Sequence, residues 1–174
     1  MTGVQTCALP IYIDCGEGKD YATKQEAATA LSKFLEDSGL GHIGTPWIIS
    51  SGGGLHVYFP FEEDVTVATW KPVAENLKRL AKKLGFNIDA SVTGDAARIL
   101  RVPDTHNYKQ EKPRKVVIKV EGGVFDFEAL ADHLRTAVGE ESYDAVMALN
   151  LPGQRPKEKP NANSVKLMEN SATY

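Results

Sequence analysis

The chain has 174 residues, 42% hydrophobic and 25% charged, and its formal net charge is -3. This composition is typical of a soluble globular protein, and no apolar run could span a bilayer, so we expect a cytoplasmic protein without a membrane partner. The negative charge argues against a protein that coats duplex DNA by bulk electrostatics. Two cysteines are too few for a cysteine-type zinc site.

Residues 1–11 differ from the rest of the chain. The segment TGVQTCALPI is, codon for codon, the translation of a common sequencing-library adapter, and we interpret 1–11 as an adapter-derived artefact. The alternatives are a short apolar strand and a signal peptide, but a signal peptide needs a basic start and a longer apolar run. Cys7 lies in this segment, which leaves Cys15 without a disulfide partner.

The first predicted elements are a strand and a helix. Residues 12–16, YIDCG, indicate a short strand that runs into glycine. Thr23 and Glu26 have the spacing of a capping box ahead of an amphipathic helix. Gly39 or Gly41 is expected to end that helix.

A hairpin and a second helix are predicted next. The apolar segments 46–50 and 55–61 flank the glycine-rich turn 51–54, which indicates a β-hairpin. Residues 67–84 carry an apolar stripe at helical spacing, and Gly85 is expected to end that helix.

The second half of the chain is more irregular. We predict a short strand at 86–89, a largely irregular segment that follows it, and a strand at 114–120. Asp126 is expected to cap a helix that reaches about residue 137, and 141–149 form one more possible helix. Because helices and strands alternate irregularly and one connection is a hairpin, the sequence predicts an α+β fold with a mixed or antiparallel sheet and flanking helices.

The domain is expected to span residues 12–149. Residues 150–163 are polar and rich in proline, which is typical of a linker. Residues 164–174 regain apolar character and then stop, so we interpret them as the start of a truncated following region.

The predicted hairpin carries a candidate phosphate site. Strand alternation separates His56 from the aliphatic side chains of Leu55, Val57 and Phe59. His56 follows the turn 51–54, whose amides and hydroxyls can form an anion-binding nest beside a ring that can carry a positive charge. The alternatives are a structural histidine and a flexible turn, since SGGG lacks the Lys-Ser/Thr ending of a P-loop.

Two carboxylates stand at the ends of predicted strands. Asp14 and Asp89 could project into one cleft, where oxygen ligands hold Mg²⁺ or Mn²⁺, although for either one alone a turn-forming aspartate is the favoured interpretation. A basic stretch follows. Its cations could bind phosphate, or they could simply form a solvated surface. Its cations are Arg98, Arg101, Lys109, Lys112, Arg114 and Lys115.

Four segments occur in an informative order: YID (12–14), SSGGGLHVYFP (50–60), NID (87–89) and TGDAARILRVPDTHNYK (93–109). Together they resemble the catalytic domain of archaeo-eukaryotic primases, in the form found in phage and plasmid primase-polymerases. The resemblance covers roughly residues 12 to 120. It implies a primase-polymerase core that contains an RRM-like unit.

The resemblance also implies roles for individual residues. Asp14 and Asp89 would be catalytic metal ligands, with Glu17 a weaker candidate, and His56 would be catalytic. The nucleotide-binding residues would be Ser51, Gly52, Gly53, Gly54, His56, Arg98, Arg101 and Lys109, with Asn107 nearby.

The implied reaction is template-directed primer synthesis or extension by two-metal phosphoryl transfer, with Mg²⁺ or Mn²⁺ as cofactor. The implied partners are a single-stranded DNA template, nucleoside triphosphates and a helicase domain in the full-length parent. The implied location is the cytoplasm, that of the host cell if the protein is phage-encoded.

The sequence departs from the family pattern at two positions. Asp104 stands where the family usually has glycine, and aspartate tolerates the left-handed conformation that such a turn needs. Tyr12 stands where the first motif has a carboxylate. The adapter ends in a single T, so we hypothesise that this T displaced the first base of an aspartate codon. Reads joined without the adapter should then show GAT or GAC, and any other first base contradicts the hypothesis.

Two other functions are compatible with part of this pattern. A non-catalytic nucleic-acid-binding replication module would explain Tyr12 but not the acidic residues near His56. A metal-dependent nuclease or rolling-circle initiator would favour a His-x-His metal site, and no such pair occurs in the sequence.

Overall fold

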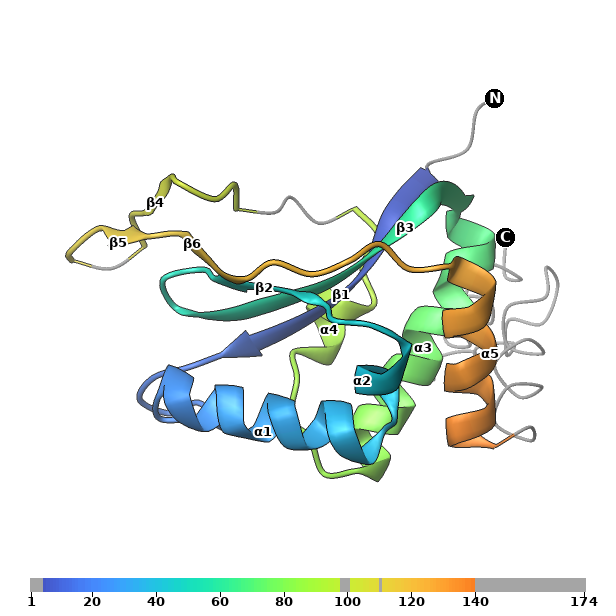
Figure 1. Ribbon diagram of the computed structural model, residues 1–174. Coiled ribbons are helices and arrows are strands. Elements are labelled where there is room, and N and C mark those ends of the chain that lie inside the picture. The colour runs from blue at the N-terminus through green and yellow to red at the C-terminus, as the bar shows by residue number, and fades with distance from the viewer. Residues whose placement is uncertain (1–4, 98–100, 110, 140–174) are drawn as a thin grey trace, which may run out of the picture.

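The computed structural model describes residues 5–97, 101–109 and 111–139 (Figure 1). Its elements, in chain order, are β1 (Gln5–Asp14), α1 (Lys24–Asp37), α2 (Leu40–Ile43), β2 (Trp47–Ser50), β3 (Gly54–Thr66), α3 (Val67–Lys83), α4 (Ala90–Thr93), β4 (His106–Asn107), β5 (Arg114–Lys115), β6 (Val117–Val120) and α5 (Phe127–Val138).

Four strands form the main sheet, in the order β1-β3-β2-β6, and every neighbouring pair is antiparallel. The predicted hairpin is confirmed as β2 and β3, with Ser50 opposite Leu55 across the glycine-rich turn. β4 and β5 form a separate two-stranded ribbon that extends away from the body of the molecule (Figure 1). The described chain is therefore α+β with an antiparallel sheet and flanking helices, as the sequence predicts.

The two faces of the main sheet are covered differently. Helices α1, α3 and α5 pack on one face, where alternate residues of β1 and β3 form the main core with them. The strand residues of this core include Leu9, Ile11, Ile13, Leu55, Val57 and Phe59. The other face carries a smaller cluster formed by Tyr12, Ile49, Tyr58 and Val116. This second face is the one on which strand alternation places His56.

The predicted helix caps are confirmed. The Thr23 hydroxyl accepts a hydrogen bond from the Glu26 amide at 3.2 Å, and the Glu26 carboxylate accepts one from the Ala22 amide at 3.0 Å. Asp126 caps α5 by accepting a 2.7 Å bond from the Ala129 amide. Gly39 follows α1 with a φ of 73°, which a residue with a side chain adopts less readily.

Two strand predictions need correction. Residues 86–89 form no strand, because a single backbone bond, from the Asp89 amide to the Tyr12 carbonyl at 2.8 Å, joins them to β1. The predicted strand 114–120 is divided at Val116, which is fully buried and exchanges backbone bonds of 2.9 Å with Asp104 and Thr105. β5 therefore pairs with β4, and β6 pairs with β2.

β1 runs across residue 12, where the sequence analysis places the start of the domain. Residues 8–11 pair with β3, and Leu9 and Ile11 are fully buried. In the folded chain, the adapter-like residues from Gln5 onward therefore form part of the sheet. This corresponds to the alternative of a short apolar strand for this segment. The predicted helix at 141–149, the linker at 150–163 and residues 164–174 lie outside the described residues.

Within the described ranges, no helix combines the length and apolar character needed to cross a membrane.

Candidate functional site

Asp14 and Asp89 line the same pocket. Asp14 is the last residue of β1, and the amide of Asp89 itself bonds to the outer edge of β1 at Tyr12. The pocket has a volume of about 170 Å³. Its lining residues are Asp14, Lys19, Asp20, Tyr21, Asn87, Ile88 and Asp89. Tertiary structure therefore joins two carboxylates that are far apart in the sequence.

Lys19 occupies the same pocket and was missed by the sequence analysis. Its ammonium group forms an ion pair of 3.1 Å with the Asp14 carboxylate, whose side chain is 60% exposed. The hydrogen bond and charge of Asp14 raise the pKa of Lys19, and the charges of Asp89 and Asp20 act in the same direction. The pocket therefore attracts a positive charge, which Lys19 supplies in this structure.

The Asp89 carboxylate is held in place by the helix that it caps. Its Oδ1 accepts hydrogen bonds from the amides of Ser91 and Val92, both 3.1 Å, and from the Ser91 hydroxyl at 2.6 Å. Because the Asp89 amide also bonds to the Tyr12 carbonyl, both the backbone and the side chain of Asp89 are fixed relative to β1.

The glycine-rich turn is rigidly held by its neighbours. The Ser51 carbonyl accepts a bond from the Asn107 side chain at 2.9 Å, and the Gly52 carbonyl accepts one from Arg114 at 3.1 Å. The Gly53 carbonyl accepts from the Cys15 amide, and the Gly54 carbonyl from the Ser51 amide, both at 3.0 Å. All four carbonyls of this turn are therefore hydrogen-bonded within the protein.

Close packing explains two of the three glycines of this turn, Gly52 and Gly54. Gly52 has a φ of 87°, and a Cβ there would lie 3.0 Å from the Cβ of Asn107 and 3.1 Å from that of Arg114. A Cβ on Gly54 would overlap the backbone carbonyl of Ile13. The turn therefore joins the end of β1, which carries Asp14, to the segment that carries Asn107 and Arg114.

His56 lies on the expected face of β3, but its environment differs from the expectation. The side chain is buried, its Nδ1 lies 3.0 Å from the Tyr58 hydroxyl, and its ring meets the Tyr12 ring edge-on at 4.6 Å. Burial and the charge of Arg101 lower the pKa of His56 from 6.5 to about 4. At neutral pH the ring is uncharged, so the interpretation of His56 as a cation beside the turn is not supported.

Tyr12 lies directly opposite His56 in the β1–β3 register. Tyr12 is buried. The burial of Tyr58 and its contact with Tyr12 raise the pKa of Tyr58. Because residues 12 and 14 of a strand point to the same face, a carboxylate at position 12 would lie on the face of Asp14 and His56. The two tyrosines and His56 instead form an aromatic cluster there.

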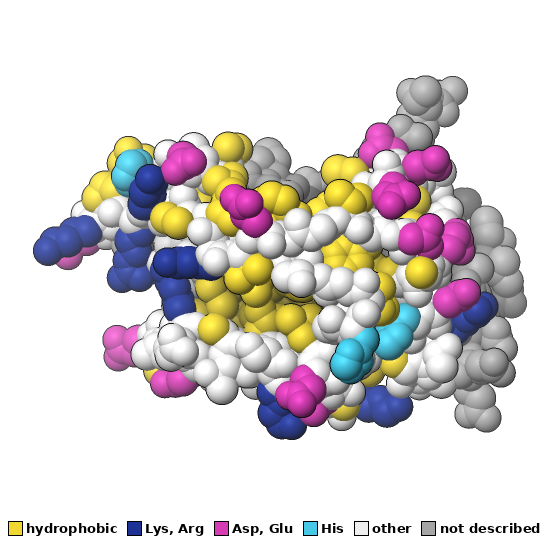
Figure 2. Space-filling view, viewed as in Figure 1, with side chains coloured by type: hydrophobic (Ala, Val, Ile, Leu, Met, Phe, Trp, Pro, Cys, Tyr) yellow, Lys and Arg dark blue, Asp and Glu magenta, His cyan; other side chains and the backbone are white. Residues whose placement is uncertain are grey.

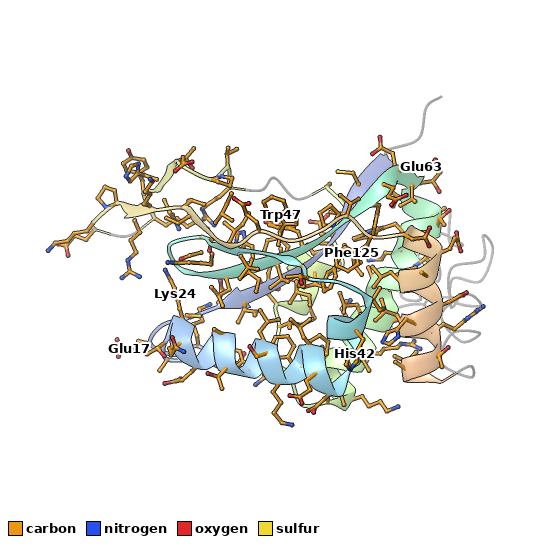
Figure 3. The ribbon with its side chains drawn as sticks, viewed as in Figure 1. Glu17, Lys24, His42, Trp47, Glu63 and Phe125 are labelled. Carbon is orange, nitrogen blue, oxygen red and sulfur yellow. The ribbon has the colours of Figure 1, made fainter. Side chains whose placement is uncertain are left out.

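The remaining predicted residues are divided among several places. The charge of Arg101 lowers the pKa of His56. Arg101 also lines a separate apolar pocket of about 340 Å³ with Trp47 and Tyr58 (Figure 3 labels Trp47). Lys109 is exposed, and its amide bonds to the Asn107 side chain at 3.1 Å. Glu17 is exposed, and Arg98 lies outside the described residues.

Asp104 confirms the expectation for its turn. Its φ of 64° is the left-handed conformation for which the family pattern uses glycine, and it is the only non-glycine residue of the described chain with a positive φ. Its carboxylate forms an ion pair of 3.0 Å with Lys115 on β5.

No family model, curated protein or solved structure matches this chain. What the site can do therefore follows from its own geometry.

Proposed function

We propose that the chain is a nucleotidyltransferase domain of the primase-polymerase type, which extends a primer on a single-stranded DNA template. The observation that carries the proposal is the shared pocket of Asp14 and Asp89, next to the turn that leads into His56. Two carboxylates at one end of a rigid sheet, beside backbone amides of a glycine turn, form a common arrangement for handling a triphosphate.

The carboxylate pair fits a metal ion that arrives with its substrate. Among the described residues, no group of three or more His, Cys, Asp or Glu side chains could hold a metal ion. Mg²⁺, however, usually keeps several waters and binds one or two carboxylates together with substrate phosphates. Asp14 and Asp89 would hold such an ion, which would supply stabilisation of the negative charge that develops on the transferred phosphorus and its oxygens.

The residues of the chain would contribute position and charge. Asp89 is preorganised by three hydrogen bonds, whereas Asp14 must exchange its ion pair with Lys19 for the incoming ligand. Lys19, once released, is a cation close to where the triphosphate would lie. His56, uncharged at neutral pH, can contribute a hydrogen bond rather than a charge.

The order of the chain in the sheet supports the RRM-like part of the proposal. With the four-residue α2 left aside and the non-strand segment 86–89 in the place of a last strand, the succession β1, α1, β2, β3, α3 and 86–89 follows a β-α-β-β-α-β pattern. The single bond from Asp89 joins that last segment to the outer edge of β1, beyond the sheet order β1-β3-β2-β6. Asp14 and Asp89 then come from neighbouring positions in such a unit.

A second candidate function is a nucleic-acid-binding module of the same fold that does no chemistry. Tyr12 favours it, because this buried ring takes the position of the first-motif carboxylate and packs against His56. The Lys19–Asp14 ion pair agrees with it too, since a cation already neutralises one of the two carboxylates.

A calorimetric titration of Mn²⁺ with a nucleoside triphosphate separates the two candidates. Four proteins are compared: the chain as it stands, Tyr12→Asp, Tyr12→Asn as the uncharged control, and Tyr12→Asp with Asp89→Ala. We expect Tyr12→Asp to tighten binding about tenfold, which corresponds to about 1.4 kcal/mol, because it adds a charged oxygen ligand on the face of β1 that carries Asp14. The added Asp89→Ala should abolish the gain, and Tyr12→Asn should not produce it.

If all four folded proteins bind alike, or none binds, the carboxylate assignment fails and the non-catalytic module is the better interpretation. Primer extension by Tyr12→Asp on a primed single-stranded template then tests the reaction itself. Glu63→Gln, an exposed change at the far end of β3 (Figure 3), is the control for loss of a surface carboxylate.

A further inference from the structure

Three cations from three different elements converge beside the glycine-rich turn. Lys24, in the first turn of α1, points toward this turn (Figure 3), and its Nζ donates a 2.8 Å hydrogen bond to the Ser50 hydroxyl. Arg114 of β5 donates to the Gly52 carbonyl at 3.1 Å. Lys119 of β6 is exposed, and it is close enough for its charge to lower the pKa of Lys24. We call Lys24, Arg114 and Lys119 the turn cations.

Among the described residues, the turn cations have no acidic partners. In the part of the chain that the structure describes, none of the three forms an ion pair with a carboxylate, whereas Lys19, Lys33, Lys71, Lys78, Lys115 and Arg135 do. Partial burial lowers the pKa of Lys24, and the charges of Arg114 and Lys119 lower it further. An anion at this place would relieve that repulsion, because it would neutralise charges that no carboxylate of the described chain balances.

The ribbon of β4 and β5 continues this positive surface. Lysine and arginine side chains gather at the end of the molecule where the ribbon and the β2–β3 turn lie (Figure 2). The ribbon region also carries Lys109, Lys112 and Lys115. Tyr108 is 74% exposed there, with its ring 6.2 Å from that of His106. An exposed aromatic ring among cations is an arrangement that binds unpaired bases together with their phosphates.

We propose that the turn cations and the β4–β5 ribbon form a binding surface for single-stranded nucleic acid, with backbone phosphates at Lys24, Arg114 and Lys119 and an unpaired base stacked on Tyr108. This surface would hold the template strand of the proposed function. The identification of the bound strand as a template rests on that proposed function. The binding itself requires neither Asp14 nor Asp89. A single strand fits better than a duplex because only unpaired bases present a face for Tyr108 to stack on.

The overall charge of the chain agrees with such a local surface. With a net charge of -3, the protein as a whole repels a polyanion, so binding must come from a confined group of cations. The Asp14 pocket is close to the turn, because Cys15, next to Asp14, donates a backbone bond to the Gly53 carbonyl. A strand held at the turn cations would therefore pass close to the proposed transferase pocket.

Fluorescence anisotropy of a labelled 12-nucleotide thymidine strand, measured in EDTA over a series of salt concentrations, tests the surface. The double variant carries Lys24→Met and Lys119→Gln, which remove the charges but keep much of each side chain. A second variant carries Arg114→Gln alone. Lys82→Gln, an exposed lysine on α3, is the matched control. Circular dichroism melting curves check that every variant is folded.

We expect the double variant to weaken binding at least tenfold. It should also make the slope of log K against log salt shallower by about 1.4, at about 0.7 for each lost phosphate contact. Tyr108→Ala should weaken binding with little change in slope, because stacking releases no counterions. Lys82→Gln should bind like the parent chain.

Several results overturn the proposal. One is that the parent chain does not bind the strand. Another is that the folded double variant binds as tightly as the parent chain. A third is that a duplex of the same length binds as tightly as the single strand. Displacement of the strand by a metal-free nucleoside triphosphate at equal phosphate concentration would assign the turn cations to the triphosphate instead. Because EDTA removes metal ions, failure here is distinct from failure of the carboxylate site.

Discussion

At the residue level, His56 illustrates how burial changes the chemistry of a side chain. The sequence pattern places the ring on the correct face of β3, and residues from neighbouring strands then determine its charge. Tyr12 of β1 meets the ring edge-on, and the Tyr58 hydroxyl bonds to its Nδ1. A buried imidazolium lacks the hydration that stabilises its charge in water, so the protonated form is disfavoured. His56 is therefore a neutral hydrogen-bonding group of the sheet at physiological pH.

We expect His56 to make folding stability fall as pH falls from about 6.5 to about 4. In this window the unfolded chain binds a proton at His56 and the folded chain does not, because the folded pKa is about 4. The contribution is fully present above pH 6.5 and is lost by about pH 4, and its full size is about 3 kcal/mol. Urea unfolding at several pH values measures it.

The difference between the parent chain and His56→Gln isolates this effect from the carboxylates, which titrate in both proteins. The difference in unfolding free energy should shrink toward pH 4. A difference that stays constant between pH 4 and 7 would mean that His56 is solvated or protonated in the folded protein.

At the level of elements, the β2–β3 turn positions the site. It connects β2 to β3, its carbonyls accept bonds from Asn107 of β4 and Arg114 of β5, and the Gly53 carbonyl accepts one from Cys15 just after β1. Strands β1 and β3 pair from Gln5 to Asp14, so the turn lies where Asp14 leaves the sheet. The turn thus contacts both the strand end that carries Asp14 and the turn cation Arg114.

The glycines of this turn are not equivalent, which gives a test with a built-in control. In Gly54→Ala the new Cβ would overlap the Ile13 carbonyl and force β1 away from β3, so we expect a loss of about 3 kcal/mol or more. In Gly53→Ala the Cβ meets nothing within 4 Å, and the change should be neutral or stabilise by up to about 1 kcal/mol.

Chemical denaturation of the two alanine variants provides the comparison. Equal stabilities would show that the close approach of Gly54 to β1 is absent in solution. The same pair also reports on the site, because only Gly54→Ala should move Asp14 away from Asp89.

At the level of the whole molecule, the first strand links the unusual N-terminal residues to the core. Leu9 and Ile11 are fully buried beneath the helices, and the Trp70 indole donates a 3.0 Å bond to the Ala8 carbonyl. These contacts join β1 to α3. Whatever the origin of residues 1–11, the folded chain depends on those from Gln5 onward for the edge of its sheet.

We expect deletion of residues 1–11 to abolish cooperative unfolding. Burial of Leu9 and Ile11 contributes about 3 to 6 kcal/mol together, which is comparable with the net stability of a typical domain. The loss also exposes the edge of β3, so aggregation should increase. Cys7→Ser, an exposed change in the same strand, is the control.

Thermal unfolding followed by circular dichroism, with light scattering for aggregation, measures both effects. If the shortened chain melts at the temperature of the parent chain, residues 5–11 contribute nothing to stability, and the domain begins at residue 12.

Much of the local structure could be predicted from the sequence. The capping pair Thr23 and Glu26, the apolar stripe of α3 and the glycine-rich hairpin are signals within a few residues, and each produced the expected element. Such features depend on backbone geometry and short-range hydrogen bonds, which neighbouring residues determine by themselves. The same holds for Asp104, whose side chain tolerates the left-handed turn.

Only the tertiary structure decided how the site is assembled. It reduced the strand at 86–89 to one bond with β1, brought Asp14 and Asp89 to one pocket, and paired Asp14 with Lys19. It also gathered Lys24 and Lys119 around the turn from α1 and β6. Sequence spacing carries no information on such distances, because they depend on how strands pair and helices pack. The charge of a buried group likewise depends on neighbours that only folding provides.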